Sequence, residues 1–358
     1  MDGRHTIAVS AIAVSDTVAD RRPGQNPAVQ AEGLVKVYAG DVRAVDGIDL
    51  RVEQGEFFGL LGPNGAGKTT TIRILATLLR PTSGRAVVAG LAVGRDDAAI
   101  RRRIGYAAQL VAVDGMATGR ENLELVGRLH RVPRPELRRR IDELLELTGL
   151  ASVAGKLAAT YSGGMRRRLD LACALVHRPA VLFLDEPTEG LDPQSRAALW
   201  DELRRINGSG TTMFLTTHYM DEADRLCGRV AIVDRGRIVV EGTPAELKRS
   251  IGSDVVSLRF DADGPADLEH RRAQVGRLLE GFRGLDRIEP VADGLALFVA
   301  DAGRAIPELL RRLDGDGVRV GSLTLNEPTL DDVFLRYTGK RIREEEAGGP
   351  VILGWWSA

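Results

Sequence analysis

The sequence predicts an α/β core that is interrupted by a helical segment and followed by a small α+β domain. Three observations lead to this fold class. A glycine-rich run at residues 62–70 stands between a strand-like and a helical pattern. Short apolar runs, typical of buried parallel strands, recur at 181–184, 212–216 and 230–233. After Lys248 the expected elements follow the order β-α-β-β-α-β, which is the ferredoxin-like pattern.

The elements of the first domain follow one another along residues 29–250. Residues 1–28 show neither period and are expected to form a flexible tail. From about 100 to 176 the sequence is mostly helical, which predicts a helical subdomain inside the α/β domain. The expected strands are 31–38, 42–52, 56–61, 103–108, 181–184, 212–216 and 230–233, and the expected helices are 69–79, 101–103, 121–130, 135–148, 195–207 and 221–227.

The second domain is expected to cover residues 251–340, with a tail at 341–358. Trp355 and Trp356 in that tail are expected to belong to a frayed chain end, and contact with a membrane interface or a partner is the alternative. The expected elements are strands 255–260, 288–291, 295–299 and 318–325, and helices 266–280, 304–313 and 329–337.

Composition and charge exclude several classes of protein. With 49 Lys and Arg against 50 Asp and Glu, the net charge is −1, so no overall field attracts nucleic acid. Cys173 and Cys227 are too few and too far apart for a disulfide framework, so both are expected in the core of a reduced, cytoplasmic protein. No apolar run approaches the ~18 residues that span a bilayer. The apolar stretch at 7–14 is a poor signal peptide because Ser10 breaks it, so the chain is not expected to cross a membrane by itself.

The run at 62–70 has the composition of a phosphate-binding loop. Its glycines let backbone N–H groups converge on a phosphate, and the helix that follows adds its positive end. Lys68 is expected to reach the β- and γ-phosphates of ATP, and Thr69 to place its hydroxyl on Mg²⁺. A simple glycine-rich turn, the alternative, does not require a Lys-Thr pair at this offset behind a strand. The expected ATP-binding residues are Gly62, Pro63, Asn64, Gly65, Ala66, Gly67, Lys68, Thr69 and Thr70.

Four polar side chains that follow strand-like runs are candidates for catalysis. Asp185 suits the Mg²⁺ shell, and Glu186 is expected to polarise the attacking water. Gln109 can touch Mg²⁺ and that water, while His218 can hydrogen-bond to the γ-phosphate. Taken singly, each residue is also explained as a solvated or packed polar side chain. Their positions relative to the phosphate loop favour one site.

Two further features complete the expected site. Ser162, Gly163 and Gly164 lie at the start of a predicted helix and form a second anion-binding end, which their own phosphate loop does not need. Two copies paired head-to-tail would complete each other's sites, so a homodimer is expected. Tyr38 precedes the loop on the first strand, where its ring can stack on adenine; packing in the core is the alternative.

Taken together, these motifs resemble the ATP-binding cassette (ABC) ATPases. The resemblance covers about residues 29–250 and implies a P-loop NTPase core with antiparallel β and helical subdomains. It also implies that the signature of one chain binds the γ-phosphate of ATP held by the other, and that Asp192 couples the two sites. The matching elements, in the family's order, are the Walker A loop at 62–70, the Q-loop Gln109, the signature Ser162-Gly163-Gly164, the Walker B strand at 181–185 with Glu186, the D-loop Leu191-Asp192 and the H-loop His218.

Residues 161–172 and 328–334 look like the daunorubicin-resistance type of drug exporter ATPase. Met165 stands where many ABC members have Gln, Tyr161 where many have Leu, and Ala108 where Pro is frequent. This closer resemblance implies export of a hydrophobic drug or antibiotic, powered from the cytoplasmic side of the cell membrane. It also implies a separate transmembrane permease subunit, with a helix that enters a groove beside Gln109.

Other functions remain open at this point. The chain can be a nucleotide-gated regulatory or structural ABC subunit, although the intact Glu186, Gln109 and His218 argue against this. It can also drive transport of another substrate, such as a lipid or polysaccharide. An ABC protein acting on ribosomes or DNA is disfavoured, because the chain has one cassette and no basic excess. For residues 250–340, a stabilising or dimer-supporting role is favoured over a small-molecule sensor.

Overall fold

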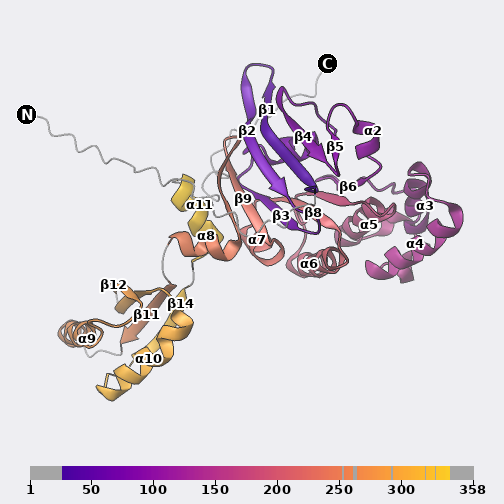
Figure 1. The fold of residues 1–358 in the computed structure, drawn as a ribbon. Helices are drawn as coiled ribbons and strands as arrows, with labels where there is room; N and C mark the ends of the chain where they lie inside the picture. The colour runs from indigo at the N-terminus through magenta and orange to yellow at the C-terminus, as the bar shows by residue number, and fades with distance from the viewer. Residues whose placement is uncertain are drawn as a thin grey trace, which may run out of the picture.

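The centre of the molecule is a six-stranded sheet with the strand order β10-β9-β3-β8-β7-β6 (Figure 1). The computed structural model describes residues 26–251, 254–260, 264–291, 293–318, 320–326 and 328–338. All neighbouring strands of this sheet are parallel except β10, which is antiparallel to β9. The strands are β3 (Phe57–Leu61), β6 (Ile104–Ala107), β7 (Val181–Asp185), β8 (Thr212–Thr217), β9 (Arg229–Asp234) and β10 (Arg237–Gly242).

Every residue of β3, β7 and β8 is buried, because helices cover both faces of the sheet. Phe58, Phe183 and Phe214 pack in the core on the side of α1, while alternate residues such as Leu182 and Leu184 belong to the core on the other side. Burial on both faces explains why these strands are continuous apolar runs. The parallel arrangement brings the loops after β3, β7 and β8 to one edge. The covering helices are α1 (Lys68–Leu75), α5 (Gly163–Leu175), α6 (Pro193–Gly208) and α7 (Met220–Leu226).

A second, antiparallel sheet with the order β2-β1-β4-β5 shares the core on the α1 side. This sheet confirms the antiparallel β subdomain that the ABC resemblance implies. Its strands β4 and β5 were not predicted, because the first half of β4 is exposed and β5 has only two residues. The strands are β1 (Val29–Tyr38), β2 (Val42–Val52), β4 (Ser83–Val88) and β5 (Leu91–Ala92).

The helical segment contains α3 (Gly119–Leu129), α4 (Arg134–Leu147) and α5, all expected from the sequence. Thr118 caps α3 in a capping box: its hydroxyl accepts from the Glu121 N–H at 3.2 Å, and Glu121 accepts in return. The helix predicted at 101–103 is wrong, because these residues form a turn after the short α2 (Asp97–Ile100). The strand predicted at 103–108 is confirmed as β6, which pairs with β7.

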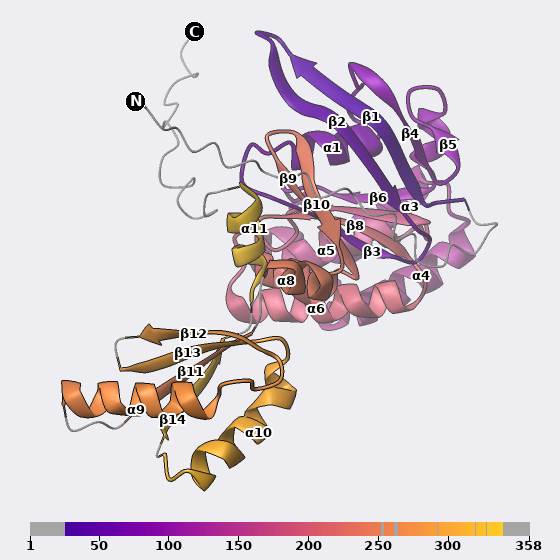
Figure 2. The same cartoon turned by 60° about the vertical axis from the view of Figure 1, so that its left-hand side comes forward.

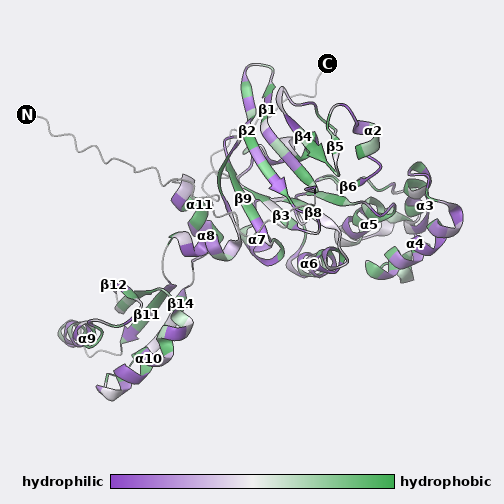
Figure 3. Cartoon of the chain, viewed as in Figure 1, coloured by the Kyte–Doolittle hydropathy of each residue, from purple (hydrophilic) through white to green (hydrophobic). Residues whose placement is uncertain are grey.

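The C-terminal region contains a four-stranded antiparallel sheet with the order β12-β13-β11-β14, which confirms the ferredoxin-like prediction. Helices α9 and α10 lie together on one face of this sheet (Figure 2). Their apolar stripes bury the core, and Figure 3 shows hydrophobic and hydrophilic stripes alternating on α10. The elements are β11 (Asp254–Phe260), α9 (Pro265–Leu278), β12 (Leu285–Val291), β13 (Gly294–Val299), α10 (Ala302–Gly315) and β14 (Val320–Asn326).

The last described helix, α11 (Leu330–Thr338), packs on the first domain rather than on the ferredoxin-like sheet. It contacts α7, β10 and α8 (Pro244–Ile251), a helix that was not predicted. Its buried residues Leu330, Val333 and Phe334 belong to the core that lies under α5, α6 and α7. The ferredoxin-like unit is therefore joined to the cassette through two packed helices, one before and one after it (Figure 2).

Replacing Phe334 with Ala is expected to lower the free energy of unfolding by about 3–5 kcal/mol, because the ring is 1% exposed in this core. Tyr337→Ala on the same helix is the matched control; Tyr337 is 44% exposed, and its loss is expected to change stability by less than about 0.5 kcal/mol. Urea unfolding of the full chain measures both variants. Equal effects would contradict the packing of α11 on the cassette.

Across the described ranges, no helix has both the length and the apolarity needed to cross a bilayer. Residues 1–25 and 339–358 lie outside these ranges, so the frayed end expected for Trp355 and Trp356 stays a prediction. Of the two cysteines, Cys227 is buried as expected, whereas Cys173 is half-buried on α5.

Candidate active site

The phosphate loop joins β3 to α1 at the carboxyl edge of the central sheet. Lys68, the first residue of α1, is buried, and its Nζ donates to the carbonyl oxygens of Gly62 at 2.8 Å and Pro63 at 2.9 Å. Gly67 has a φ of +103°, and a Cβ there would lie 2.2 Å from the Ala44 carbonyl oxygen, so only glycine fits. The loop therefore curls around its own lysine, with the helix N-terminus beneath it.

Asp185 ends β7 and is fully buried at this edge. Its Oδ1 accepts hydrogen bonds from the hydroxyls of Thr69 at 3.1 Å and Thr216 at 2.7 Å, and its Oδ2 accepts from Tyr106 at 3.3 Å. Burial and the Asp185 charge raise the pKa of Tyr106 to about 12, so the phenol keeps its proton and donates. Hydroxyl groups from three different elements thus hold the Asp185 carboxylate beside the phosphate loop.

Glu186 follows with a φ of +48°, a left-handed conformation that costs on the order of 1–2 kcal/mol for a residue with a Cβ. Its N–H donates to the Thr216 carbonyl oxygen at 3.0 Å, which holds this turn. The carboxylate then lies between two cationic or polar groups: Oε1 is 3.2 Å from Lys68 Nζ, and Oε2 is 3.2 Å from His218 Nδ1. Backbone strain of this kind is typical of functional positions.

The Lys68–Glu186 pair is buried, since its side chains are 3% and 7% exposed. Burial raises the pKa of Glu186, but His218 and Lys68 outweigh it, so the pKa lies below the usual value. Burial lowers the pKa of Lys68, and Glu186 and Asp185 oppose that shift. Glu186 is therefore a carboxylate at neutral pH, able to accept a proton.

Two predicted site residues lie at the margin of this cluster. Gln109 is exposed and donates to Glu189 Oε2 at 2.6 Å, rather than to the Thr69–Asp185 pair. Tyr38 is 42% exposed, and its hydroxyl lies 3.5 Å from that of Thr70. Core packing, the alternative for Tyr38, is therefore wrong, because the ring is open to solvent beside the phosphate loop.

The signature residues begin α5, away from the phosphate loop of the same chain. Ser162 caps the helix, since its hydroxyl accepts from the Met165 N–H at 3.2 Å. A Cβ on Gly164 would lie 2.8 Å from the hydroxyl of Ser195, which in turn donates to Asp192 at 2.6 Å. The signature and the D-loop thus form one surface. Among the hydrogen bonds of the described residues, none joins this surface to the phosphate loop.

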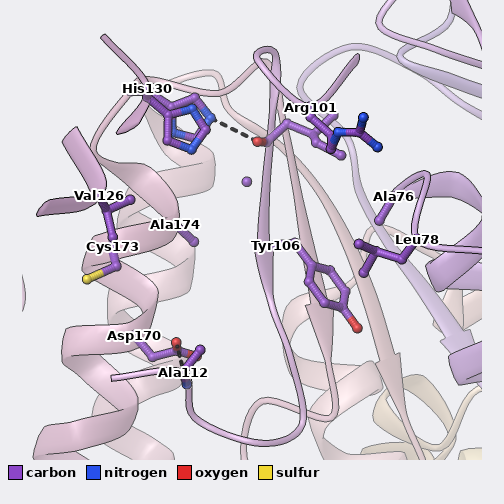
Figure 4. A pocket seen from close by; sticks show the side chains of 13 residues that line it. Ala76, Leu78, Arg101, Tyr106, Ala112, Val126, His130, Asp170, Cys173 and Ala174 are labelled. Carbon is purple, nitrogen blue, oxygen red and sulfur yellow. Dashed lines mark hydrogen bonds between the residues drawn. The ribbon is translucent and has the colours of Figure 1, made fainter. Parts of the chain in front are cut away.

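A cavity of about 410 Å³ lies between the central sheet and the helical segment (Figure 4). Its walls come from β6, α3, α5 and the end of α1, and Gln109 lies in the loop between Tyr106 and Ala112, which both line it. His130 and His177 stack in its wall with ring centroids 3.7 Å apart. Burial and the neighbouring His130 lower the pKa of His177 to about 4, so that ring is neutral. The cavity is largely apolar, with Asp170 and Arg101 among the polar residues of its wall.

Several residues that contact this site were not predicted from the sequence. Thr216 and Tyr106 have signals that can be recognised, because both lie near the carboxyl ends of strands adjacent to β7. Glu189 has none, and the buried Arg167 lies in the recognised segment 161–172, where nothing in the sequence pattern indicates its contacts. Their contacts depend on how loops far apart in the sequence meet.

Comparison with known proteins agrees with this geometry. Residues 45–189 match the model of the ABC transporter family, and residues 242–338 match the C-terminal domain of DrrA1-3-like ATP-binding proteins. Daunorubicin resistance ATP-binding protein DrrA2 of Streptomyces coeruleorubidus is 46% identical over 324 residues, which are 89% of this chain and 98% of that protein. Daunorubicin/doxorubicin resistance ATP-binding protein DrrA of Streptomyces peucetius is 48% identical over 314 residues, which are 87% of this chain and 92% of the relative.

Solved structures show the same fold. The chain aligns with cbiO1 of Clostridium perfringens, part of the ABC transporter complex cbiONQ, at a TM-score of 0.59 and 27% identity, covering 72% of this chain and all of that one. It also aligns with the dimeric post-hydrolysis state of the cassette MJ0796 bound to ADP and Pi, at a TM-score of 0.55 and 27% identity, covering 60% and 98%. With a P-loop NTPase core and relatives that match along nearly its whole length, this chain belongs to the ABC transporter family and is one of its ATP-binding, ATP-hydrolysing subunits.

Proposed function

We propose that this chain hydrolyses ATP to drive export of a hydrophobic drug or antibiotic through a separate membrane subunit. The observation that carries the hydrolytic part is the buried contact of Glu186 with Lys68 and His218 at the edge of the sheet. The export part is supported by relatives named for daunorubicin and doxorubicin resistance. A regulatory subunit without hydrolysis is less well supported, because a subunit that only binds ATP does not require a strained, ionised glutamate beside the phosphate loop.

The residues around Asp185 fit a magnesium ion. A carboxylate oxygen and the Thr69 hydroxyl already touch at 3.1 Å, and oxygen ligands are those that Mg²⁺ prefers. When bound with ATP, the ion would neutralise charge on the phosphates. Gln109 can join this set only when its side chain leaves Glu189, so we expect its loop to move on nucleotide binding.

Each catalytic side chain has a distinct role in the proposed reaction. Lys68 would turn from the loop carbonyls toward the β- and γ-phosphates, which form stronger charge-assisted hydrogen bonds. Glu186 would take a proton from the attacking water, because its pKa keeps it ionised. His218 would hold the γ-phosphate and keep Glu186 oriented. Tyr38, beside Thr70, would stack on the adenine ring.

A homodimer would complete the site. Ser162, Gly163 and Gly164 offer a free helix N-terminus, the usual place for a phosphate. Since they lie apart from their own phosphate loop, the γ-phosphate they bind would belong to the opposite chain. Asp192 would couple the two sites, because it accepts a hydrogen bond from Ser195, which lies against Gly164 of the signature.

The membrane partner would dock in the cavity beside Gln109, on the cytoplasmic face of the membrane. The cavity lies between the sheet and the helical segment, and its wall includes Leu78, which is 56% exposed. Such an apolar surface suits a short helix of the permease. Nucleic acid is not an expected partner, because the net charge is −1.

The test is drug transport by the reconstituted transporter. Inside-out vesicles that contain the chain and its membrane subunit should accumulate daunorubicin when MgATP is added, measured by quenching of drug fluorescence. Vesicles with the Glu186→Gln chain are the control and should show no accumulation. ATP turnover without accumulation of daunorubicin or any related hydrophobic drug would refute the export part and leave ATP hydrolysis standing.

A further inference from the structure

A buried arginine–aspartate pair on the signature helix contacts three parts of the site. Arg167 and Asp170 both lie on α5, where they are 5% and 6% exposed, and Arg167 Nη1 is 3.3 Å from Asp170 Oδ2. The roles proposed above include neither residue. Both point away from solvent, into the junction between the helical segment and the central sheet.

The guanidinium of Arg167 donates to backbone carbonyls on both sides of Glu186. Its Nε donates to Pro187 O at 2.7 Å, and its Nη2 donates to Asp185 O at 3.4 Å. A third donor, Nη1, bonds to the carbonyl oxygen of Ala108, directly before the Q-loop glutamine. One planar side chain therefore joins the catalytic turn to the Q-loop, which a fork of five N–H donors makes possible.

Asp170 holds the other end of the Q-loop. Its Oδ1 accepts a hydrogen bond from the Ala112 N–H at 3.2 Å, which Figure 4 shows in the wall of the cavity. The pair thus binds the Q-loop at Ala108 O and at Ala112 N. If Ala112 in the cavity wall moves, Asp170 and Arg167 would shift with it. The carbonyl groups of Asp185 and Pro187, which flank Glu186, would then shift as well.

Stability alone does not account for this pair. Burial raises the pKa of Asp170 and lowers that of Arg167, which reflects the cost of taking both charges out of water. Apolar side chains of similar volume usually serve stability equally well or better than a buried ion pair. The pair instead provides hydrogen bonds with defined directions to three backbone segments.

We propose that Arg167 is a positioning residue, which sets the distance between the Q-loop, the catalytic turn at Glu186 and the signature helix. Asp170 orients Arg167 through their ion pair and couples it to the cavity wall, because it accepts the hydrogen bond from Ala112. This inference rests on the proposed hydrolytic role of Glu186. A displacement of about 1 Å in a catalytic group can cost ~100-fold in rate, so a support of this kind affects turnover directly.

The test compares Arg167→Lys with Arg168→Lys in the full chain. Lysine keeps the charge but cannot reach three carbonyls at once, so we expect kcat of Arg167→Lys to fall by ~10–100-fold, with KM for ATP within ~3-fold. Arg168 is the matched control, because it lies on the same helix and, within the part of the chain that the structure describes, its hydrogen bond goes to Thr148 O in the helical segment, at 3.0 Å. Its kcat is expected to stay within about twofold of wild type.

The ATP turnover rate is divided by the amount of bound nucleotide. This division distinguishes an effect on the positioning of catalytic groups from a loss of folded protein. A structural role would reduce the amount of folded, nucleotide-binding protein and leave kcat per site unchanged; that result overturns the proposal. The kcat of Asp170→Asn should fall less than that of Asp170→Ala, because asparagine keeps an oxygen that accepts the hydrogen bond from the Ala112 N–H. Equal kcat values per site in Asp170→Asn, Asp170→Ala and wild type also overturn it.

If Arg167→Lys does not fold, a second variant tests the same proposal. Ala112→Pro removes the N–H that Asp170 accepts, at an exposed loop residue, and should lower kcat in the same direction. Wild-type kcat in this variant overturns the proposal. Glu186→Gln is measured in parallel: if it is inactive while the Arg167 and Ala112 variants are normal, only the positioning role fails. If Glu186→Gln turns over normally, the proposed function itself fails.

Discussion

Replacing Glu186 with Gln is expected to lower ATP turnover by ~100-fold or more while ATP still binds. Glutamine has nearly the same shape but cannot take a proton from water. The contacts of the carboxylate with Lys68 and His218, at 3.2 Å each, show that Glu186 is held in place rather than free in solvent. The measurement is the rate of phosphate release at saturating MgATP, together with equilibrium binding of ATP.

Glu202→Gln is the matched control for this experiment. Glu202 is also a buried carboxylate, on α6, but it makes no contact with the phosphate loop. Burial raises its pKa to about 7, so it is already largely neutral below that pH, and an amide should change turnover by less than about twofold. A Glu186→Gln protein with wild-type turnover would contradict the assignment of the base.

Gly163→Asp, tested in the Glu186→Gln background, is expected to abolish ATP-dependent dimerisation and leave ATP binding by the single chain intact. The new carboxylate would lie where the phosphate of the opposite chain is expected, and like charges repel. The substitution should not harm the fold, because a Cβ on Gly163 meets nothing within 4 Å. An acidic side chain in the first turn also suits the helix dipole of α5.

Mass determination by light scattering measures the dimer, and nucleotide binding is measured on the same samples. Gly155→Asp is the matched control: it adds the same charge at a position with open space, outside the signature. That control should form the ATP-dependent dimer like the parent. If Gly163→Asp instead weakens ATP binding by the monomer, the signature contacts the phosphate of its own chain, and the head-to-tail dimer is refuted.

Local patterns explain how much of the site could be predicted. Lys68, Thr69, Asp185 and Glu186 could be identified because their neighbours in the sequence create their environment: a loop before a helix, and an apolar strand before two acids. The same reasoning placed Ser162 at a helix N-terminus. The βαββαβ order predicted the C-terminal sheet for a similar reason, since each step depends only on adjacent elements.

The errors and omissions arise where contacts join distant parts of the chain. The run at 101–103 was predicted as a helix, whereas it forms the turn that leads from α2 into β6, and β6 pairs with β7 some 77 residues later (104 to 181). The contacts of the helix at 330–338 with α7 and α8 were not predicted, because they join it to residues far earlier in the chain. The hydrogen bond between Gln109 and Glu189, which lie 80 residues apart, was not predicted.

By itself, the sequence determined the family, the nucleotide and which residues are candidates for catalysis, because these depend on short motifs with fixed backbone conformations. Only the tertiary structure decided how the groups support one another. It brought Thr69, Thr216 and Tyr106 to one carboxylate, and it placed Arg167 between the Q-loop and the catalytic turn. The physical reason is that a buried polar group needs hydrogen-bond partners, and the fold supplies them from distant parts of the chain. The spacing of residues along the sequence does not show which of these partners will meet.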